Sequence, residues 1–359
     1  MKIRQVNVFF RSMKLSEPYS IAYESFDRCE SVFVQVSTDN GYHGWGCAAP
    51  DPHVTGESAA DVQHCMNHSI EPYLLGRDVF EYGQIIDFLM QRFPAHPAAR
   101  SMVDMALYDI IAQKAGVPLY KLLGGFRKRI PTSITIGIMP VRSTLTFARL
   151  YQKRGFRILK IKGGLDVLED IERVNRVRES VGEHVTIRFD ANQGYTLQES
   201  LNFIEGVRNA HIELLEQPTK KNDIEMLKIL THKSDVPVMA DESLLSLSDA
   251  FHISRDHCTD LINIKLMKTG GILEAMHINS VARAAGIGAM VGCMDESALG
   301  ISAGLHFALS RPNILYADLD GHLDIINDPF QGMLTIEQGE IIPPESNGLG
   351  WLGLKSIDI

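Results

Sequence analysis

The chain has 359 residues, of which 45% are hydrophobic, and it carries a formal net charge of -9. This length allows one large hydrophobic core together with a smaller domain. The acidic balance gives no electrostatic reason to expect a nucleic acid or an anionic membrane as a partner, so we expect neither.

The cysteines and the N-terminal stretch indicate a reduced protein that is not secreted. Five cysteines are present, an odd number without a CxxC pair, which argues against a disulfide framework or a structural zinc site. The opening stretch MKIRQVNVFFRSMK holds no apolar segment long enough for a signal peptide, and no run of about 18 uncharged apolar residues occurs. We therefore expect a cytoplasmic location.

The first part of the chain has the pattern of an α+β unit. Antiparallel strands are predicted over residues 3–10, 31–38 and 41–46, and Asp39-Asn40-Gly41 is a tight-turn signal between the last two. Helical patterns follow. The clearest spans residues 98–116, because its apolar positions recur every three to four residues and it ends at a glycine shortly before a proline.

From Pro131 onward, apolar strand-like runs alternate with segments of helical length. Near-continuous apolar runs indicate strands that are buried on both faces, and alternation with helices indicates parallel pairing. The eight runs are TSITIGI, RILKIKG, VTIRFDA, IELLEQP, VPVMADE, LINIKLM, GAMVGCM and ILYADLD. They predict an α/β fold of the TIM-barrel type, in which chemistry takes place at the C-terminal ends of the strands. The tail after the eighth run has the pattern of a hairpin that packs back on the N-terminal unit.

Three carboxylates close consecutive strand-like runs: Asp190, Glu216 and Asp241. Side chains at the ends of neighbouring barrel strands can converge on one cation. Ligation by oxygen alone suits a hard ion such as Mg²⁺, whereas zinc favours histidine and cysteine. A single aspartate at a strand end is often a helix cap, but three in succession predict a metal site.

Lysines lie on both sides of these carboxylates in the sequence. Lys160 and Lys162 are two residues apart, so they share one face of the second strand, and their mutual repulsion is expected to lower the pKa of at least one. Lys265 lies on the sixth strand, across the barrel. One lysine on each face of a metal-bound substrate can remove a proton and return it to the opposite face, which is a 1,1-proton transfer.

The runs LKIKGG, FDANQGYT, LLEQP, ADES and NIKLMKTGG resemble the successive barrel motifs of the muconate-lactonizing-enzyme branch of the enolase superfamily. The resemblance covers essentially the whole chain. It implies a (β/α)7β barrel over residues 126–325, a capping domain over residues 1–125 and a C-terminal segment, 326–359, that packs on the cap. It also implies one Mg²⁺ per subunit on Asp190, Glu216 and Asp241, with Lys162 and Lys265 as the acid/base pair, and a homo-oligomer.

Asp318 and Asp320, at the end of the eighth strand, discriminate between the reactions of this branch. Spaced by two, they face the same way and provide a counter-charge for an ammonium group. The pattern resembles that of dipeptide epimerases, where such a pair holds the free α-amino group of the dipeptide. An N-acylamino acid racemase or a cycloisomerase stays open as an alternative, in which both aspartates are structural. A catalytically silent enolase-like binding scaffold is a third possibility.

The remaining expectations concern substrate selection. Asp295 follows the seventh strand, and Glu24 lies where relatives acting on Ala-Glu are expected to carry a basic residue. Two acidic residues would repel an acidic dipeptide, so they favour dipeptides that contain lysine or arginine; the alternative is that they form salt bridges or caps at a wet surface. The resemblance also places Thr135 against the substrate, and Lys160 beside the reacting carboxylate as an additional cation.

Overall fold

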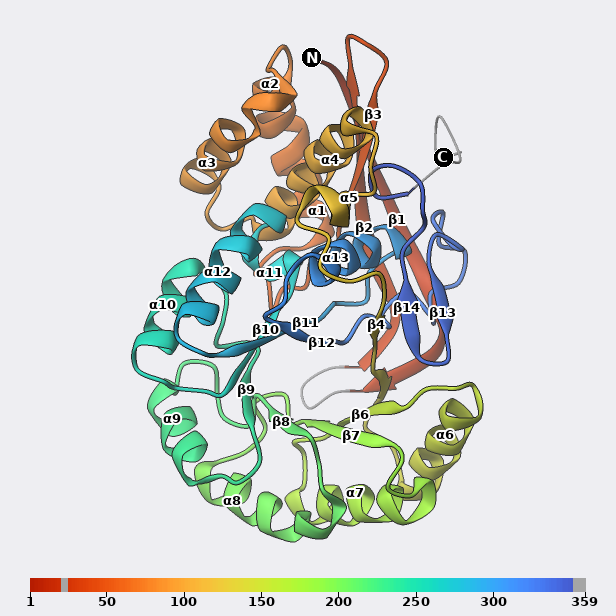
Figure 1. The fold of residues 1–359 in the computed structure, drawn as a ribbon, viewed down its shortest axis with the longest axis vertical. Coiled ribbons are helices and arrows are strands. Elements are labelled where there is room, and N and C mark those ends of the chain that lie inside the picture. The colour runs from red at the N-terminus through yellow and green to blue at the C-terminus, as the bar shows by residue number, and fades with distance from the viewer. Residues whose placement is uncertain (21–24, 351–359) are drawn as a thin grey trace.

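The N-terminal part of the molecule is a three-stranded antiparallel sheet covered by helices (Figure 1). The coordinates are those of a computed structural model, which describes residues 1–20 and 25–350. The strands are β1 (Ile3–Ser20), β2 (Ser25–Thr38) and β3 (His43–Ala48). The helices are α1 (Ala59–Cys65), α2 (Glu71–Leu74), α3 (Tyr82–Arg92), α4 (Pro97–Ala115) and α5 (Leu119–Leu122), with a π-helical turn over Met66–Ile70 and a 3₁₀ turn over Val79–Glu81.

Helix α4 is the central packing element of this part. It is buried along almost its whole length and ends at Gly116, which adopts a left-handed conformation with φ of 71°, as the sequence predicts. Strand β3 lies close against it because two of the strand residues are glycines. A Cβ atom at Gly46 would lie 1.8 Å from the carbonyl oxygen of Met102, so no other residue fits there without moving backbone.

We expect Gly46→Ala to destabilise the protein by about 3 kcal/mol, because the added methyl group overpacks a rigid backbone contact. Gly83→Ala in the first turn of α3 is the matched control, since a Cβ atom there meets nothing within 4 Å. Its effect should be neutral or slightly stabilising. Thermal unfolding followed by circular dichroism measures both, and an unchanged melting temperature for Gly46→Ala would contradict the packing argument.

The second part of the molecule is a parallel barrel of eight strands. Their order follows the sequence from β5 to β12, and a parallel bridge between Thr132, just before β5, and Ala317 of β12 brings the two ends of the sheet together. The strands are β5 (Ile134–Ile136), β6 (Ile158–Lys162), β7 (Thr186–Asp190), β8 (Leu214–Glu216), β9 (Val238–Ala240), β10 (Leu261–Ile264), β11 (Gly288–Val291) and β12 (Ile314–Ala317). Every predicted barrel run contains one of them, so the predicted fold class is confirmed.

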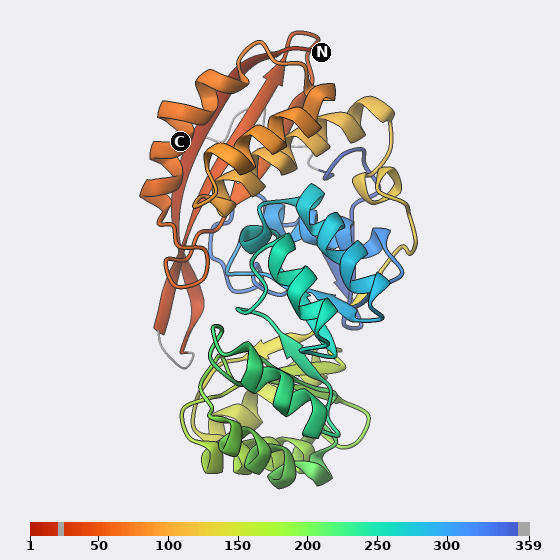
Figure 2. The same ribbon diagram turned by 90° about the vertical axis from the view of Figure 1, so that its left-hand side faces the viewer.

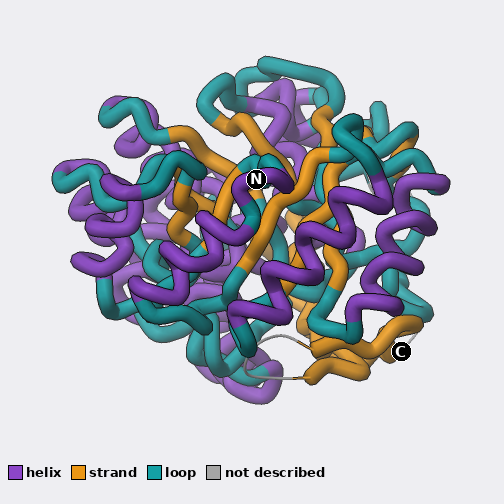
Figure 3. The backbone as a smooth tube through the Cα atoms, turned by 90° about the horizontal axis from the view of Figure 1, so that it is seen from below, coloured by secondary structure: helices purple, strands orange, loops and turns teal. Residues whose placement is uncertain are grey.

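Helices surround the barrel strands (Figure 3). They are α6 (Val141–Lys153), α7 (Val167–Val181), α8 (Leu197–Gly206), α9 (Ile224–Lys233), α10 (Leu247–Arg255), α11 (Leu266–Thr269), α12 (Ile272–Ala284) and α13 (Ala298–Ser310), with a 3₁₀ turn over Arg208–Ala210. Within residues 1–20 and 25–350, no helix is long and apolar enough to cross a membrane. All five cysteines carry unpaired thiols.

The two parts meet along several elements, which include the hairpin of β1 and β2, helix α4 and the C-terminal segment. The predicted strand over residues 3–10 is too short, because β1 runs on to Ser20 by pairing with β2. The long hairpin thereby reaches down beside the barrel (Figure 2), where the carbonyl of Ser20 accepts a 2.9 Å hydrogen bond from the amide of Ile138. The tail forms the hairpin β13 (Thr335–Glu337) and β14 (Glu340–Ile342), which extends the short strand β4 (Ile130–Pro131).

Candidate active site

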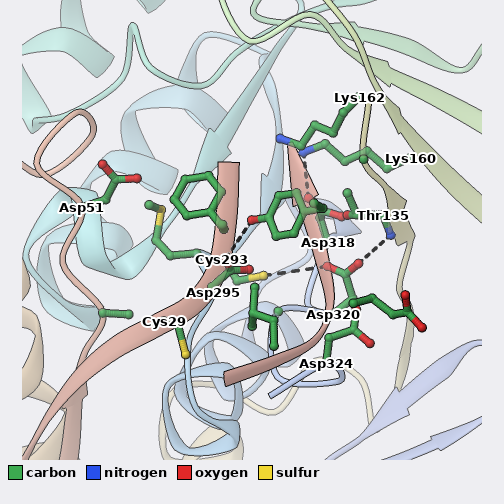
Figure 4. Close-up of a pocket in the computed structure, with 18 of the residues that line it drawn as sticks. Cys29, Asp51, Thr135, Lys160, Lys162, Cys293, Asp295, Asp318, Asp320 and Asp324 are labelled. Atoms are coloured by element: carbon green, nitrogen blue, oxygen red, sulfur yellow. Dashed lines mark hydrogen bonds and ion pairs between the residues drawn. The ribbon is translucent and has the colours of Figure 1, made fainter. Parts of the chain in front are cut away.

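A cavity of about 360 Å³ lies between the C-terminal ends of the barrel strands and the N-terminal hairpin. The barrel supplies its floor, including both lysines of β6 and both aspartates that follow β12. The N-terminal part supplies residues of β1, β2 and the loop after β3. Figure 4 shows Lys160 and Lys162 reaching into this space from β6, opposite Asp295 and Asp51. The cavity therefore combines barrel chemistry with a wall from another part of the chain.

The three predicted metal ligands converge beside this cavity. The strand register places Lys162, Asp190 and Glu216 side by side on β6, β7 and β8, and Asp241 follows the next strand. One carboxylate oxygen from each of Asp190, Glu216 and Asp241 lies within 4.8 Å of the others, and all three residues are buried. The predicted cluster is thus assembled by neighbouring strands that end at the same level.

Each carboxylate has one oxygen held by the protein framework. Asp190 Oδ1 accepts the amide of Asn192 at 2.9 Å, and Glu216 Oε1 accepts the side-chain amide of Asn263 at 2.8 Å. Asp241 Oδ1 accepts a hydrogen bond from the buried ammonium of Lys268. The other oxygen of each carboxylate faces a lysine of the cavity floor. Such fixed orientation is typical of residues around a metal site.

The donor set fits a hard divalent cation. Burial, and then the charge of Asp190, raise the pKa of Glu216 to about 8, so a cation bound beside this carboxylate would favour its ionised form. Asn192 and Glu242 line the cavity beside the cluster, and each has a buried side-chain oxygen without a hydrogen-bond partner among the described residues. Carboxylate and amide oxygens without histidine or cysteine are the ligands that Mg²⁺ prefers.

Two lysines approach opposite ends of the carboxylate cluster. Lys162 Nζ lies 2.7 Å from Asp190 Oδ2, and Lys265 Nζ lies 2.8 Å from Asp241 Oδ2. Lys265 directly follows β10, as predicted. The outer carboxylates thus separate the two amines, and both amines line the same cavity. The two amines thus flank the carboxylate cluster in the order of the strands.

At Lys160, attraction from three carboxylates outweighs the repulsion expected from the neighbouring lysine. Burial opposes its charge, but Nζ lies 2.8 Å from both Asp318 Oδ2 and Glu216 Oε2 and 3.0 Å from Asp190 Oδ2. These attractions outweigh burial and hold the pKa of Lys160 well above its usual value. Burial likewise opposes the charge of Lys265, yet Asp241 raises its pKa. The two-residue spacing in the sequence could not reveal these partners.

Asp318 and Asp320 both line the cavity but differ in environment. Burial disfavours the charge of Asp318, but Lys160 and a 2.6 Å hydrogen bond from the Ser133 hydroxyl lower its pKa to about 2. Asp320 accepts a 2.6 Å hydrogen bond from the backbone amide of Thr135, while burial and the charge of Asp318 raise its pKa to about 7. A cationic group beside Asp320 would relieve this repulsion.

The other predicted contacts lie in or near the same cavity. Thr135 lines it and orients Asp320 through its backbone. Asp295 also lines it and accepts a 2.7 Å hydrogen bond from the Tyr19 hydroxyl. Glu24 lies outside the described residues. Sequence reasoning missed Tyr19, Asn263 and Lys268; for Lys268 a signal existed, because it lies one helical turn after Lys265.

Two family profiles match the chain. The profile described as "Mandelate racemase / muconate lactonizing enzyme, N-terminal domain" matches residues 3–124, and "Enolase C-terminal domain-like" matches residues 144–351. The L-Ala-D/L-Glu epimerase of Bacillus subtilis is 39% identical over 98% of this chain and 97% of its own length. Its substrate-liganded structure superposes with a TM-score of 0.96 over 98% of this chain and 99% of that one.

Two further relatives differ in their named substrates. The L-Lys-D/L-Arg epimerase of Methylococcus capsulatus is 39% identical over 98% of this chain and 99% of its own. A dipeptide epimerase from this organism, solved with Mg and L-Arg-D-Lys, has a TM-score of 0.92 over 98% of this chain and 99% of that one. The N-succinyl-L-Arg/Lys racemase of Bacillus cereus is 33% identical over 91% of this chain and 89% of its own.

Proposed function

Because the chain belongs to the mandelate racemase/muconate lactonizing enzyme family of the enolase superfamily, we propose that it is a Mg²⁺-dependent dipeptide epimerase. The reaction is a 1,1-proton transfer at the Cα atom of the C-terminal residue. One observation carries the proposal: two lysines approach opposite ends of an acidic cluster, and an aspartate pair lines the same cavity. The two lysines can exchange a proton, and the aspartate pair can bind a free amino group.

Lys162 and Lys265 exchange the proton. One amine takes the Cα proton as the Cα–H electrons move toward the carboxylate, and the other ammonium then gives a proton to the opposite face. The configuration of the substrate decides which lysine starts. Asp190, Glu216 and Asp241 would hold Mg²⁺, which would supply positive charge against the negative charge that develops on the substrate carboxylate. Lys160 adds a fixed cation beside the same carboxylate group, since it lies among Asp190, Glu216 and Asp318.

Asp318 and Asp320 orient the other end of the dipeptide. Lys160 already neutralises Asp318, so Asp320 is the better-placed partner for the α-ammonium group of the substrate. Thr135 fixes Asp320 for this role and borders the substrate. A muconate-type substrate has no amine for this position, which disfavours a cycloisomerase. A silent scaffold is disfavoured because both lysines and all three carboxylates remain.

An N-succinyl amino acid racemase is the second candidate, supported by the Bacillus cereus relative. Its substrate carries an additional carboxylate in place of the α-ammonium group. Asp320, Asp324 and Asp295 line the cavity and oppose such a group, whereas Lys160 already neutralises Asp318 and Arg28 in the same lining would attract it. Like charges that meet in a partly buried site cost affinity. N-succinyl-lysine and N-succinyl-arginine therefore belong in the substrate panel as competing candidates.

We expect the enzyme to favour dipeptides with lysine or arginine side chains. Asp295 lines the cavity, and Glu24 is proposed to add a second negative charge. Mass spectrometry of deuterium uptake from D₂O, with pooled L,L-dipeptides and Mg²⁺, tests both the reaction and this preference. Exchange should concentrate in the cationic pools. Faster exchange of Ala-Glu than of every cationic dipeptide would refute the preference, and exchange only in N-succinyl amino acids would refute dipeptide epimerisation.

The organisation of the enzyme follows from the same proposal. Residues 1–125 form the cap, residues 126–325 form the catalytic barrel, and residues 326–359, of which 351–359 lie outside the described residues, form a C-terminal segment that packs on the cap. The enzyme acts in the cytoplasm as a homo-oligomer. Light scattering coupled to gel filtration measures the oligomeric state directly, and a monomer at micromolar concentration would contradict it.

A further inference from the structure

Tyr19 is held in place by the barrel although it belongs to β1. A Cβ atom at Gly137 would lie 2.9 Å from Cβ of Tyr19, so the glycine permits the close approach of the hairpin. The next residue, Ser20, accepts the amide hydrogen of Ile138. The ring of Tyr19 also packs against Phe26 of β2, with centroids 5.4 Å apart. These contacts fix the direction in which the hydroxyl points.

The hydroxyl of Tyr19 donates a hydrogen bond to Asp295 Oδ2 at 2.7 Å, across 276 residues of sequence. Asp295 follows β11 and lines the cavity. Among the described residues its Oδ1 atom has no hydrogen-bond partner, and no cationic group lies within 4 Å of its carboxylate. One oxygen is therefore anchored, and the other is available to a molecule in the cavity.

Two more carboxylates of this region show the same arrangement. Asp51 Oδ1 accepts the amide of His53 at 2.7 Å, and Asp324 Oδ1 accepts the Ser16 hydroxyl at 3.1 Å. Both line the cavity, and neither forms an ion pair within residues 1–20 and 25–350. Their negative charges disfavour ionisation of Asp295. A cation that enters this region would offset the repulsion among the three carboxylates.

We propose that Tyr19 is a positioning residue for substrate selection, which holds Asp295 so that its second oxygen receives the cationic side chain of a dipeptide. This inference rests on the proposed epimerase function. Tyr19 does not contact the reacting atoms; it acts through the carboxylate. The alternative is that the ring of Tyr19 only packs against Phe26 and that its hydroxyl is dispensable. Tyr19→Phe separates the two, because it keeps the ring and removes the hydroxyl.

The test compares substrates that differ only in the ε-ammonium group of one side chain. L-Ala-L-Lys is paired with L-Ala-L-norleucine, and L-Lys-L-Ala with L-norleucine-L-Ala, so that either side chain can respond. In Tyr19→Phe, kcat/KM for the preferred lysine dipeptide should fall about tenfold relative to its norleucine partner, because a hydrogen bond to a charged group is removed. The change should appear in KM and not in kcat. An unchanged ratio, or an equal fall in kcat for both partners, would overturn the inference.

A double-mutant cycle with Asp295→Asn tests whether Tyr19 acts through Asp295. If it does, adding Tyr19→Phe to Asp295→Asn changes the lysine-to-norleucine ratio no further. Additive effects would show that Tyr19 acts independently of Asp295, which also overturns the inference. The proposed function and the role of Tyr19 are tested separately. If the wild-type enzyme exchanges no dipeptide, the proposed function is refuted. If the wild type exchanges dipeptides but Tyr19→Phe leaves the lysine-to-norleucine ratio unaltered, only the role of Tyr19 is refuted.

Gly137→Ala provides a second route to the same result. The added methyl group pushes against Tyr19 and displaces its hydroxyl without removing it. The lysine-to-norleucine ratio should fall again, and a wild-type ratio in a folded Gly137→Ala enzyme would count against the inference. Circular dichroism verifies folding of each variant.

The pH profile gives an independent readout. Burial raises the pKa of Asp295 to about 6, Asp324 and Asp51 add to this effect, and the Tyr19 hydroxyl and Lys162 oppose it. Removing the hydroxyl should therefore raise the pKa further. Since the ionised carboxylate binds the cation, the acidic limb of kcat/KM for lysine dipeptides should shift to higher pH in Tyr19→Phe, while the limb for norleucine dipeptides stays in place.

Discussion

Lys162→Ala and Lys265→Ala should each lower the rate of epimerisation by at least about 10³-fold, because each removes one of the two groups that carry a proton. The geometry predicts more than a loss of rate. The surviving lysine still lies on one face of the substrate, at the Asp190 or the Asp241 end of the cluster. Each variant should therefore exchange the Cα hydrogen of only one epimer with solvent, and the two variants should select opposite epimers.

Deuterium uptake measured separately with L,L- and L,D-dipeptides distinguishes these outcomes. Lys153→Ala, at the exposed end of α6, is the control for the loss of a lysine outside the cavity and should retain wild-type rates. Near-normal epimerisation in both directions by either variant would refute the two-base scheme. Loss of all exchange in both variants would show that the lysines do not act independently on the two faces.

Removing one carboxylate from the cluster should have a comparably large effect through the metal. Glu216→Gln keeps the shape of the side chain but removes a negative charge from a buried oxygen donor. Mg²⁺ affinity should fall by about 100-fold or more, because a hard cation depends on anionic oxygen ligands. Isothermal titration calorimetry measures this directly, without reference to catalysis.

Thermal unfolding supplies the second readout. A ligand that binds only the folded state stabilises it by an amount that grows with its concentration relative to Kd. Mg²⁺ should therefore raise the melting temperature of the wild type and of the exposed-site control Glu225→Gln, but hardly that of Glu216→Gln. Chelation with EDTA should abolish exchange, and Mg²⁺ should restore it. Undiminished Mg²⁺ binding by Glu216→Gln would exclude this residue as a ligand.

The sequence predicted the barrel and its acidic cluster because both depend on local patterns. Apolar runs identify strands, and charged residues at or near the ends of several of these runs identify the functional edge. Asp190, Glu216 and Asp241 converge because adjacent strands end at the same level, which follows from the fold alone. The position of Lys265 at the end of β10 follows for the same reason.

What the sequence could not predict depends on partners that are distant in the chain. The sequence places Lys160 beside Lys162, but Asp318, the carboxylate that most raises the pKa of Lys160, is 158 residues away. The polar residues 11–20 have no clear strand pattern of their own, and they become a strand only through pairing with β2. In the sequence, Asn263 is a single polar residue in an apolar run. Its role becomes visible only in the fold, where its side-chain amide donates a hydrogen bond to Glu216.

The walls of the cavity come from two different parts of the chain, so substrate preference and proton transfer can change separately. The proton-transferring lysines and the acidic cluster come from the barrel, whereas Tyr19 and Asp51 come from the N-terminal hairpin and the loop after β3. A duplicated gene can therefore acquire a new substrate preference through substitutions in the first 55 or so codons, with its chemistry untouched. Random libraries confined to residues 15–54 should yield altered selectivity more often than libraries of equal size at barrel positions other than Asp295, Asp318 and Asp320.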